Sequence, residues 1–308
     1  MSKIIEIKNL KKYFKEVKAV DDISFNVREG ELFAFLGLNG AGKSTTINIM
    51  CGSLSKDEGK ITIDNKDIDK DLDGIKSSIG IVFQNSVLDK NLNAYDNLKT
   101  RAYMYGMSKD EFNNKLNELV ELLDLKDILK RPLNKLSGGQ KRRIDIARAL
   151  IHSPKILILD EPTTGLDPQT RIMVWNVINK LRKESNLTVF LTTHYMEEAS
   201  EADYVVILDS GKIVADGTPN DLKNKYANDF IKIYFKEESK DSLVKVLKKN
   251  KFKYLENKEY FEIEVDSTKN ARDIIVNNPD LFEDFEVIKG KMDNVFLNVT
   301  GKDIKEVI

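Results

Sequence analysis

The chain has 308 residues, of which 41% are hydrophobic and 32% charged, which is typical of a folded globular protein and excludes a disordered or fibrous one. Lys and Arg total 49 against 50 Asp and Glu, so no overall field favours nucleic acid or acidic lipid. The length predicts a large core and two domains. The lone cysteine, Cys51, excludes an internal disulfide and fits a reducing cytoplasm.

No apolar run in the sequence approaches the roughly 20 residues that cross a bilayer. The longest runs, such as Ile79 to Phe83 and Val205 to Leu208, have the length of buried strands. The N-terminus alternates like a strand and lacks the long apolar core of a signal peptide. A role at a membrane is therefore expected to come through a partner.

Residues 4–36 are predicted to form β-hairpin strands, because apolar and polar residues alternate and the stretch from Arg28 to Glu31 supplies a turn. Residues 32–36 form a continuous apolar run, and residues 43–51 look helical. The phosphate-binding pattern G-x-x-x-x-G-K-[ST] stands between them as Gly37-Leu38-Asn39-Gly40-Ala41-Gly42-Lys43-Ser44. This strand, loop and helix context favours a phosphate-binding loop over an ordinary glycine-rich turn.

Phosphate oxygens need many donors that converge on a small volume. The loop glycines let backbone N–H groups point inward, and the following helix presents its positive end. Lys43 is predicted to reach the β- and γ-phosphates of a nucleotide, and the Ser44 hydroxyl to ligate Mg²⁺. Thr45 is placed to add a hydrogen bond on the α-phosphate side.

Helical periodicity dominates residues 92–152, where Phe112, Leu116 and Leu119 recur at spacings of three and four, with Ser108 as an N-cap. This region predicts an inserted helical subdomain at about 88–153. Strands are then expected at 156–159, 188–191 and 205–208, separated by helices near 168–185 and 195–201. Such alternation predicts an α/β fold whose core sheet is mainly parallel and covered on both faces.

Two carboxylates end the apolar strand Ile156-Leu157-Ile158-Leu159-Asp160-Glu161. Burying charge at a strand end is costly without a partner. These two carboxylates are therefore interpreted as functional, rather than as an acidic strand end exposed to water. Asp160 fits a role in positioning Mg²⁺. Glu161 fits the general base, or water-orienting carboxylate, for attack on the γ-phosphate.

The phrase Leu136-Ser137-Gly138-Gly139-Gln140 precedes a helix with a buried stripe. Two glycines permit close backbone approach, and the helix N-terminus with the Ser137 hydroxyl can accept a terminal phosphate. The alternative is a plain helix cap, which the motif order and Gln140 disfavour.

From about Asp229 the sequence motifs end, and residues 229–308 predict a small accessory α+β domain, with a ferredoxin-like fold as one form. Strands are expected at 231–235, 261–265 and near 285–289, with helices at 241–250 and 268–277. Acidic and basic residues also balance from residue 223 onward. The lysines within 245–253 are interpreted as a solvated helix face rather than an anion site.

Because the Leu-Ser-Gly-Gly-Gln phrase follows a phosphate-binding loop, the chain closely resembles the ABC ATPases over about residues 1–225. The resemblance implies a P-loop ABC cassette, with an antiparallel β-subdomain and an inserted helical subdomain beside the core sheet. Gln84, after the strand 79–83, then contacts Mg²⁺ and the attacking water, and His194 contacts the γ-phosphate. The other histidine, His152, is interpreted as structural.

The resemblance also implies residues at the base and at a dimer interface. Either Phe14 or Tyr13 stacks on adenine, and the sequence leaves both open. Asp167, in the loop Thr164-Gly165-Leu166-Asp167, belongs to a segment that crosses between subunits. Ser137, Gly138, Gly139 and Gln140 act on the nucleotide held by the other cassette, so that two cassettes close head-to-tail over two ATP molecules.

The implied function is the ATP-hydrolysing subunit of a membrane transporter, cytoplasmic and peripheral on the inner face of the cell membrane. Its cofactors are ATP and Mg²⁺, and its partners are a homodimer mate or paired cassette and separate transmembrane permease subunits. Nucleic acid is not expected as a partner. The phrase from Met292 to Gly301 resembles the ending of drug- and antibiotic-resistance exporters.

Two alternatives stay open: an importer ATPase with a regulatory C-terminal domain, and a soluble ABC ATPase without a transport role. The transported molecule is not visible in the sequence, because substrate contacts lie in the membrane subunits. Drug, lipid, peptide and polysaccharide all remain candidates.

Overall fold

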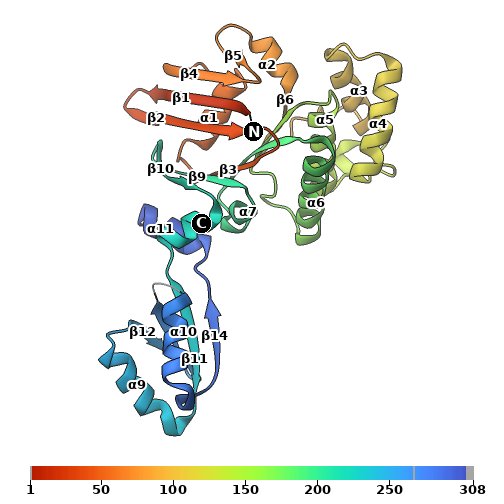
Figure 1. Ribbon diagram of the computed structural model, residues 1–308. Coiled ribbons are helices and arrows are strands. Elements are labelled where there is room, and N and C mark those ends of the chain that lie inside the picture. Colours follow the sequence, from red (N-terminus) through yellow and green to blue (C-terminus); the bar gives the residue numbers. More distant parts are fainter. Residues whose placement is uncertain (1, 266–267, 303–308) are drawn as a thin grey trace. The chain divides into compact units, whose positions relative to one another are not determined.

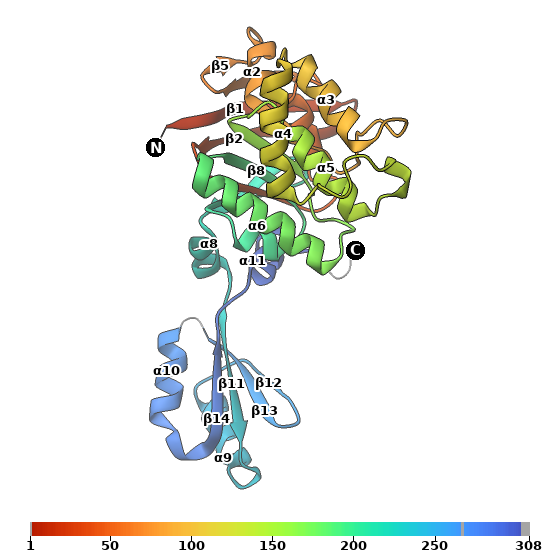
Figure 2. The same cartoon turned by 90° about the vertical axis from the view of Figure 1, so that its right-hand side faces the viewer.

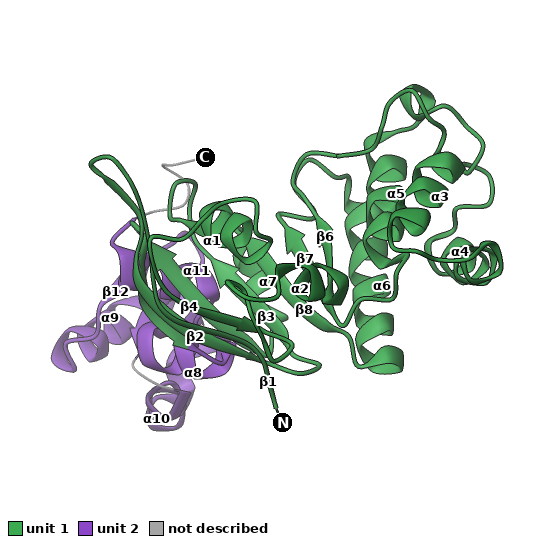
Figure 3. Cartoon of the chain, turned by 90° about the horizontal axis from the view of Figure 1, so that it is seen from above, with its two compact units in different colours: residues 1–216 green, residues 217–308 purple. Residues whose placement is uncertain are grey.

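The computed structural model describes residues 2–265 and 268–302, which Figure 1 shows coloured along the chain. The chain divides into two compact units, Met1–Asp216 and Gly217–Ile308 (Figure 3). Helix α8 (Pro219–Tyr226) belongs to the second unit. The domain boundary at about residue 225 stays a prediction. No helix among the residues that the structure describes is long and apolar enough to cross a membrane.

The first sheet of unit 1 is antiparallel, with strand order β2-β1-β4-β5. Its strands are β1 (Lys3–Phe14), β2 (Val17–Arg28), β4 (Glu58–Ile63) and β5 (Lys66–Asp67). The predicted hairpin is β1 and β2, and it turns at residues 15–16, whereas residues 29–31 lead into the next strand. β4 and β5 extend the hairpin beyond what the sequence pattern indicated.

The second sheet of unit 1 has six strands in the order β10-β9-β3-β8-β7-β6. Its strands are β3 (Leu32–Leu36), β6 (Ile79–Val82), β7 (Ile156–Asp160), β8 (Thr188–Thr193), β9 (Tyr204–Asp209) and β10 (Lys212–Gly217). The five strands from β9 to β6 pair in parallel. Parallel pairing brings the carboxyl ends of β3, β8, β7 and β6 to one edge, and this edge carries the site described below.

Unit 1 has its core between the two sheets, with helix α1 (Lys43–Met50) contributing Ile47 and Met50. Phe25 of β2 lies 5.3 Å from Phe33 and 5.2 Å from Phe35 of β3, measured between ring centres. Such ring pairs add about 0.5–1.5 kcal/mol each beyond area burial. They therefore fix β3, and the loop that follows it, against the antiparallel sheet.

The helical region comprises α3 (Ala94–Met104), α4 (Lys109–Leu123), the 3-10 turn η1 (Leu133–Lys135) and α5 (Gly138–Leu150). These helices pack on one another (Figures 1 and 2). Ser108 caps α4 through a capping box with Glu111, as the sequence predicts for an N-cap. Outside this region, α2 (Leu72–Ser78) packs on β6, α6 (Pro168–Ser185) on β8, and α7 (Met196–Ser200) on β3 and β8.

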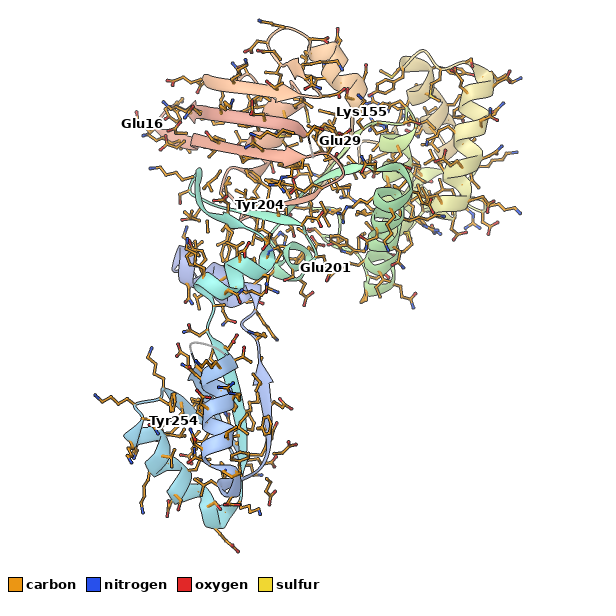
Figure 4. All side chains as sticks on the ribbon, in the orientation of Figure 1. Glu16, Glu29, Lys155, Glu201, Tyr204 and Tyr254 are labelled. Carbon is orange, nitrogen blue, oxygen red and sulfur yellow. The ribbon has the colours of Figure 1, made fainter. Side chains whose placement is uncertain are left out.

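Unit 2 contains a four-stranded antiparallel sheet in the order β12-β13-β11-β14. Its elements are β11 (Asp229–Phe235), η2 (Glu237–Ser239), α9 (Lys240–Lys249), β12 (Tyr254–Glu256), β13 (Tyr260–Val265), α10 (Thr268–Asn277), η3 (Pro279–Leu281) and β14 (Phe282–Ile288). This βαββαβ order is ferredoxin-like, so that expectation is confirmed. Figure 4 labels Tyr254, on the edge strand β12.

The phrase that resembles an exporter ending forms helix α11 (Met292–Thr300), which packs on α8. Met292, Val295 and Phe296 are buried, and the Asn298 side chain donates to the Tyr226 carbonyl at 2.8 Å. Gly301 then ends the helix in the left-handed conformation that a glycine C-cap adopts readily. The predicted C-terminal domain continues to residue 308, beyond the described residues.

Candidate active site

The phosphate-binding loop connects β3 to α1 at the carboxyl edge of the parallel sheet. Gly42 has a φ of 110°, and a Cβ there would lie 2.4 Å from the carbonyl oxygen of Ala19, so only glycine fits. Gly40 also has a positive φ, of 83°, but a Cβ there would meet no atom within 4 Å. The loop is therefore packed against the backbone of Ala19 at Gly42, and it is open at Gly40.

Lys43, the first residue of α1, has a buried side chain that is 4% exposed. Its Nζ donates to the carbonyl oxygens of Gly37 at 2.7 Å and Leu38 at 3.2 Å, and lies 3.4 Å from Oε1 of Glu161. Burial lowers the pKa of Lys43, and the charge of Glu161 opposes that shift. The ammonium group thus joins the loop to the strand end that carries the carboxylates.

Asp160, the last residue of β7, is buried, and its Oδ1 accepts a hydrogen bond from the Thr192 hydroxyl at 2.6 Å. Burial raises the pKa of Asp160, while the hydrogen bond from Thr192 lowers it. Thr192 also accepts, through its carbonyl, a hydrogen bond from the Glu161 N–H at 3.1 Å. Sequence reasoning missed Thr192, although its place in the polar end of an otherwise apolar strand is a recognisable signal.

Glu161 adopts a φ of 45°, in the left-handed region. A non-glycine residue held there costs on the order of 1–3 kcal/mol, and such strain concentrates at functional sites. The backbone bend turns the carboxylate of Glu161 from the strand end toward the phosphate-binding loop. The strained residue is the one for which the sequence predicts a catalytic role.

Four side chains approach the Glu161 carboxylate, and one of them is Thr164, whose hydroxyl donates to Oε2 at 3.4 Å. Gln84 Nε2 donates to Oε2 at 3.1 Å, His194 Nδ1 lies 3.3 Å from Oε1, and Lys43 approaches the same oxygen. Gln84 follows β6 and His194 follows β8, so residues far apart in sequence meet because their strands end at one edge. The structure therefore brings together all three predicted catalytic residues. His152 lies elsewhere, stacked on Tyr105 at 3.8 Å between ring centres.

A cleft of about 530 Å³ opens beside this cluster. The predicted residues that line it are Phe14, Leu38, Asn39, Gly40, Gly42, Lys43, Ser44, Thr45, Gln84 and Glu161. Phe14 is 46% exposed at the cleft, whereas the Tyr13 hydroxyl donates to Asp21 at 2.7 Å. Of the two aromatic candidates, the structure thus places Phe14 at the cleft.

The Ser-Gly-Gly-Gln motif forms the first turn of α5. Ser137 Oγ accepts from the Gln140 N–H at 3.2 Å, and Gln140 Oε1 accepts from the Ser137 N–H at 3.0 Å. A Cβ at Gly139 would lie 2.5 Å from the Thr170 hydroxyl oxygen of α6, whereas one at Gly138 would meet nothing within 4 Å. Gly139 is thus required for helix packing within the chain, and Gly138 leaves an open face.

Asp167 caps the neighbouring helix α6, and its carboxylate accepts from the Thr170 N–H at 3.0 Å and the Thr170 hydroxyl at 2.6 Å. The first turns of α5 and α6 therefore meet at Thr170. Among the described residues, neither motif supplies a side chain to the lining of the phosphate-binding cleft. Two groups of predicted residues are consequently separate within one chain.

The sequence and geometry can be compared with known proteins. Residues 20–164 match the family model described as "ABC transporter". Over 229 residues the chain is 40% identical to the linearmycin resistance ATP-binding protein LnrL of Bacillus subtilis, covering 74% of this chain and 73% of the relative. The chain belongs to the ABC transporter family. It is an ABC ATPase, the ATP-binding subunit of a transporter.

Other relatives of this ABC cassette carry names of the same kind. The daunorubicin/doxorubicin resistance ATP-binding protein DrrA of Streptomyces peucetius is 35% identical over 233 residues, covering 75% of this chain and 70% of the relative. The dimeric structure of MJ0796, a bacterial ABC transporter cassette, aligns with a TM-score of 0.64 at 31% identity, covering 70% of this chain and 98% of the other. The predicted family, fold class and ATPase activity are confirmed. The relatives include resistance proteins and a Nod factor export ATP-binding protein of Cupriavidus pinatubonensis, which is 34% identical over 236 residues.

The residues at the cleft fit a bound Mg²⁺. Mg²⁺ takes oxygen ligands and is bound through one or two carboxylates, together with water and phosphate oxygens. The Ser44 hydroxyl and the Gln84 amide line the cleft, and the buried carboxylate of Asp160 lies at the adjacent strand end. A cation would also offset the burial that raises the pKa of Asp160.

Proposed function

We propose that this chain is the ATP-hydrolysing subunit of an exporter, held at the cytoplasmic face of a membrane by separate transmembrane permease subunits. The proposal of ATP hydrolysis is supported mainly by one observation: Lys43, Gln84 and His194 converge on Glu161 beside the phosphate-binding loop. The direction of transport rests on relatives named for linearmycin resistance, daunorubicin/doxorubicin resistance and Nod factor export.

In this proposal the loop from Gly37 to Thr45 binds the phosphates of ATP. Backbone N–H groups of the loop and the N-terminus of α1 supply donors, and Lys43 supplies a positive charge at the β- and γ-phosphates. Ser44, Gln84 and Asp160 would hold Mg²⁺, which neutralises charge on the phosphate oxygens when bound. The sequence motif and the open front of the loop at Gly40 support this assignment.

Glu161 orients the attacking water and accepts its proton. This carboxylate suits the task because neighbouring side chains hold it at the lining of the cleft. The Gln84 amide holds one oxygen of Glu161, and His194 stands by the other, where it can also donate to a γ-phosphate oxygen. ATP hydrolysis then yields ADP and phosphate, with the proton moving from water to Glu161.

The site is completed by a second copy or a paired cassette. Ser137, Gly138, Gly139, Gln140 and Asp167 lie apart from the phosphate-binding cleft of their own chain. The open face at Gly138 and the N-terminus of α5 suit a phosphate from outside the chain. Head-to-tail closure of two cassettes over two ATP molecules uses both groups of residues, and opening after hydrolysis would move the membrane partners.

Phe14→Ala is expected to weaken ATP binding about 5- to 100-fold, because stacking on a base is worth roughly 1–3 kcal/mol. Tyr13→Ala is the matched control, since the Tyr13 side chain bonds to Asp21, and its ATP affinity should stay within about threefold of the parent. Titration with a fluorescent ATP analogue measures both. A larger loss for Tyr13→Ala than for Phe14→Ala would reverse the adenine assignment.

The whole proposal is tested by expressing the tagged full chain with the proteins encoded beside it. Recovery of a polytopic membrane protein, with ATPase activity lost on Glu161→Gln, would support the transporter subunit. Export is supported if cells with the parent complex, and not with Glu161→Gln, resist linearmycin or daunorubicin. ATP-dependent uptake into cells would favour the importer, and ATPase activity without any membrane partner would favour the soluble class.

A further inference from the structure

Arg142 lies on α5, the helix that begins at the Ser-Gly-Gly-Gln motif, and its side chain is only 6% exposed. Its guanidinium donates to three backbone carbonyl oxygens. Nη1 lies 2.5 Å from Phe83 O, Nε lies 2.8 Å from Pro162 O, and Nη2 lies 3.4 Å from Asp160 O. The first acceptor immediately precedes Gln84, and the other two flank Glu161.

This arrangement depends on the shape of arginine. The planar guanidinium carries five N–H donors in a rigid fork, so it can bond to two strand ends at once. A lysine offers one compact ammonium on a flexible stem and cannot span the same carbonyls. Arg142 therefore joins the carboxyl end of β6 to that of β7, and joins both to α5.

The hydrogen bonds of Arg142 constrain the backbone on both sides of the strained residue Glu161. Glu161 has a φ of 45°, and the carbonyls on both sides of it accept from the same guanidinium. A left-handed glutamate persists only where its surroundings over-determine the backbone. Arg142 supplies part of that constraint, together with the hydrogen bond from the Glu161 N–H to Thr192.

Asp145 follows Arg142 by three residues, so the two side chains lie on the same face of α5. The Asp145 side chain is only 4% exposed. Burial raises the pKa of Asp145, and hydrogen bonding to the Ser86 side chain and the Val87 backbone opposes that rise. α5 thus holds residue 83 through Arg142, and its buried Asp145 interacts with Ser86 and Val87 in the segment after Gln84.

We propose that Arg142 and Asp145 are positioning residues for ATP hydrolysis, which hold Gln84 and Glu161 in fixed positions relative to α5. The inference rests on the proposed catalytic roles of Glu161 and Gln84. Its consequence is that α5, whose N-terminus is proposed to meet the nucleotide of a second cassette, is hydrogen-bonded to the backbone on either side of Glu161 and just before Gln84 in its own chain.

Arg142→Lys tests the proposal in the full-length chain. It keeps the charge but cannot bond the three carbonyls, so kcat is expected to fall about 10- to 100-fold, as for a misplacement of about 1 Å. The dissociation constant for ATP should stay within about threefold, because Arg142 does not line the cleft. Arg143→Lys is the matched control, since Arg143 bonds to Asp124 and the Leu123 carbonyl, away from the strand ends.

Asp145→Asn gives a second, nearly isosteric probe that stays informative if Arg142→Lys does not fold. It is expected to lower kcat with ATP affinity unchanged. The proposal is overturned if folded Arg142→Lys and Asp145→Asn have the same kcat as Arg143→Lys. It is also overturned if their ATP affinity falls by the same factor as their kcat. Glu161→Gln in the same assay distinguishes failure of the positioning role from failure of the proposed function. Full activity of Glu161→Gln would refute the proposed function, on which the inference depends.

Discussion

Replacement of Glu161 by glutamine is expected to abolish ATP turnover while ATP still binds. The amide preserves the size of the side chain but cannot accept the proton of the attacking water, and loss of a general base costs about 10²- to 10⁴-fold in rate. Removing the carboxylate also removes a negative charge that lies 3.4 Å from Lys43, near the proposed site of the γ-phosphate. ATP should therefore bind at least as tightly as to the parent chain.

The Glu161→Gln chain is also expected to accumulate as a dimer with ATP, since closure without hydrolysis leaves no step that reopens it. Steady-state ATPase assays and light scattering after gel filtration measure the two effects. Glu201→Gln is the matched control, because Glu201 is an exposed carboxylate that follows α7 (Figure 4). A Glu161→Gln chain that stays monomeric at saturating ATP would refute the head-to-tail arrangement.

Lys43→Ala is expected to raise the dissociation constant for ATP about 10- to 100-fold. A charged hydrogen bond is worth about 1.5–3 kcal/mol, and the substitution removes the ammonium proposed to meet the β- and γ-phosphates. The substitution also leaves the buried carboxylate of Glu161 without its lysine partner. This carboxylate would then repel the phosphates of ATP. Turnover should fall as well, because the loop loses the hydrogen bonds from Lys43 to the carbonyls of Gly37 and Leu38.

Calorimetric titration with ATP measures the effect of Lys43→Ala directly. Lys155→Ala serves as the control, because Lys155 is an exposed lysine whose ammonium lies 2.9 Å from Asp64 (Figure 4). A surface ion pair is worth only about 0–1 kcal/mol, so ATP affinity should be unchanged in that variant. Equal ATP affinity in Lys43→Ala and Lys155→Ala would remove Lys43 from the phosphate site.

Much of the fold is predictable from local patterns. Alternating residues indicate β1 and β2, a continuous apolar run indicates β3, and a period of three to four residues indicates α4, because burial on one face selects each spacing. Weak or mixed patterns explain what was missed: β5 is two residues long, and β4 begins with exposed and half-buried polar residues. The helix α8 packs against α11 in unit 2, and no local pattern indicates this contact.

The candidate site divides in the same way. The phosphate-binding loop is local, so its glycines, Lys43 and Ser44 are recognisable from spacing alone. The grouping of Gln84, Glu161 and His194 follows from the order of strands β6, β7 and β8 in the sheet, which local spacing does not specify. The resemblance to ABC ATPases supplied Gln84 and His194, and the carboxylates at the strand end supplied Glu161, before the structure placed the three together.

Contiguous motifs were enough to indicate the class of protein, the phosphate-binding loop and the carboxylates at the end of β7, because their chemistry depends on neighbours in the chain. The packing of the folded chain was needed to place Phe14 rather than Tyr13 at the cleft, and Gly139 against Thr170. It was also needed to show that Arg142 bonds to backbone carbonyls at the ends of β6 and β7. Such contacts join segments that are distant in sequence, and their formation depends on how strands and helices pack rather than on residue spacing.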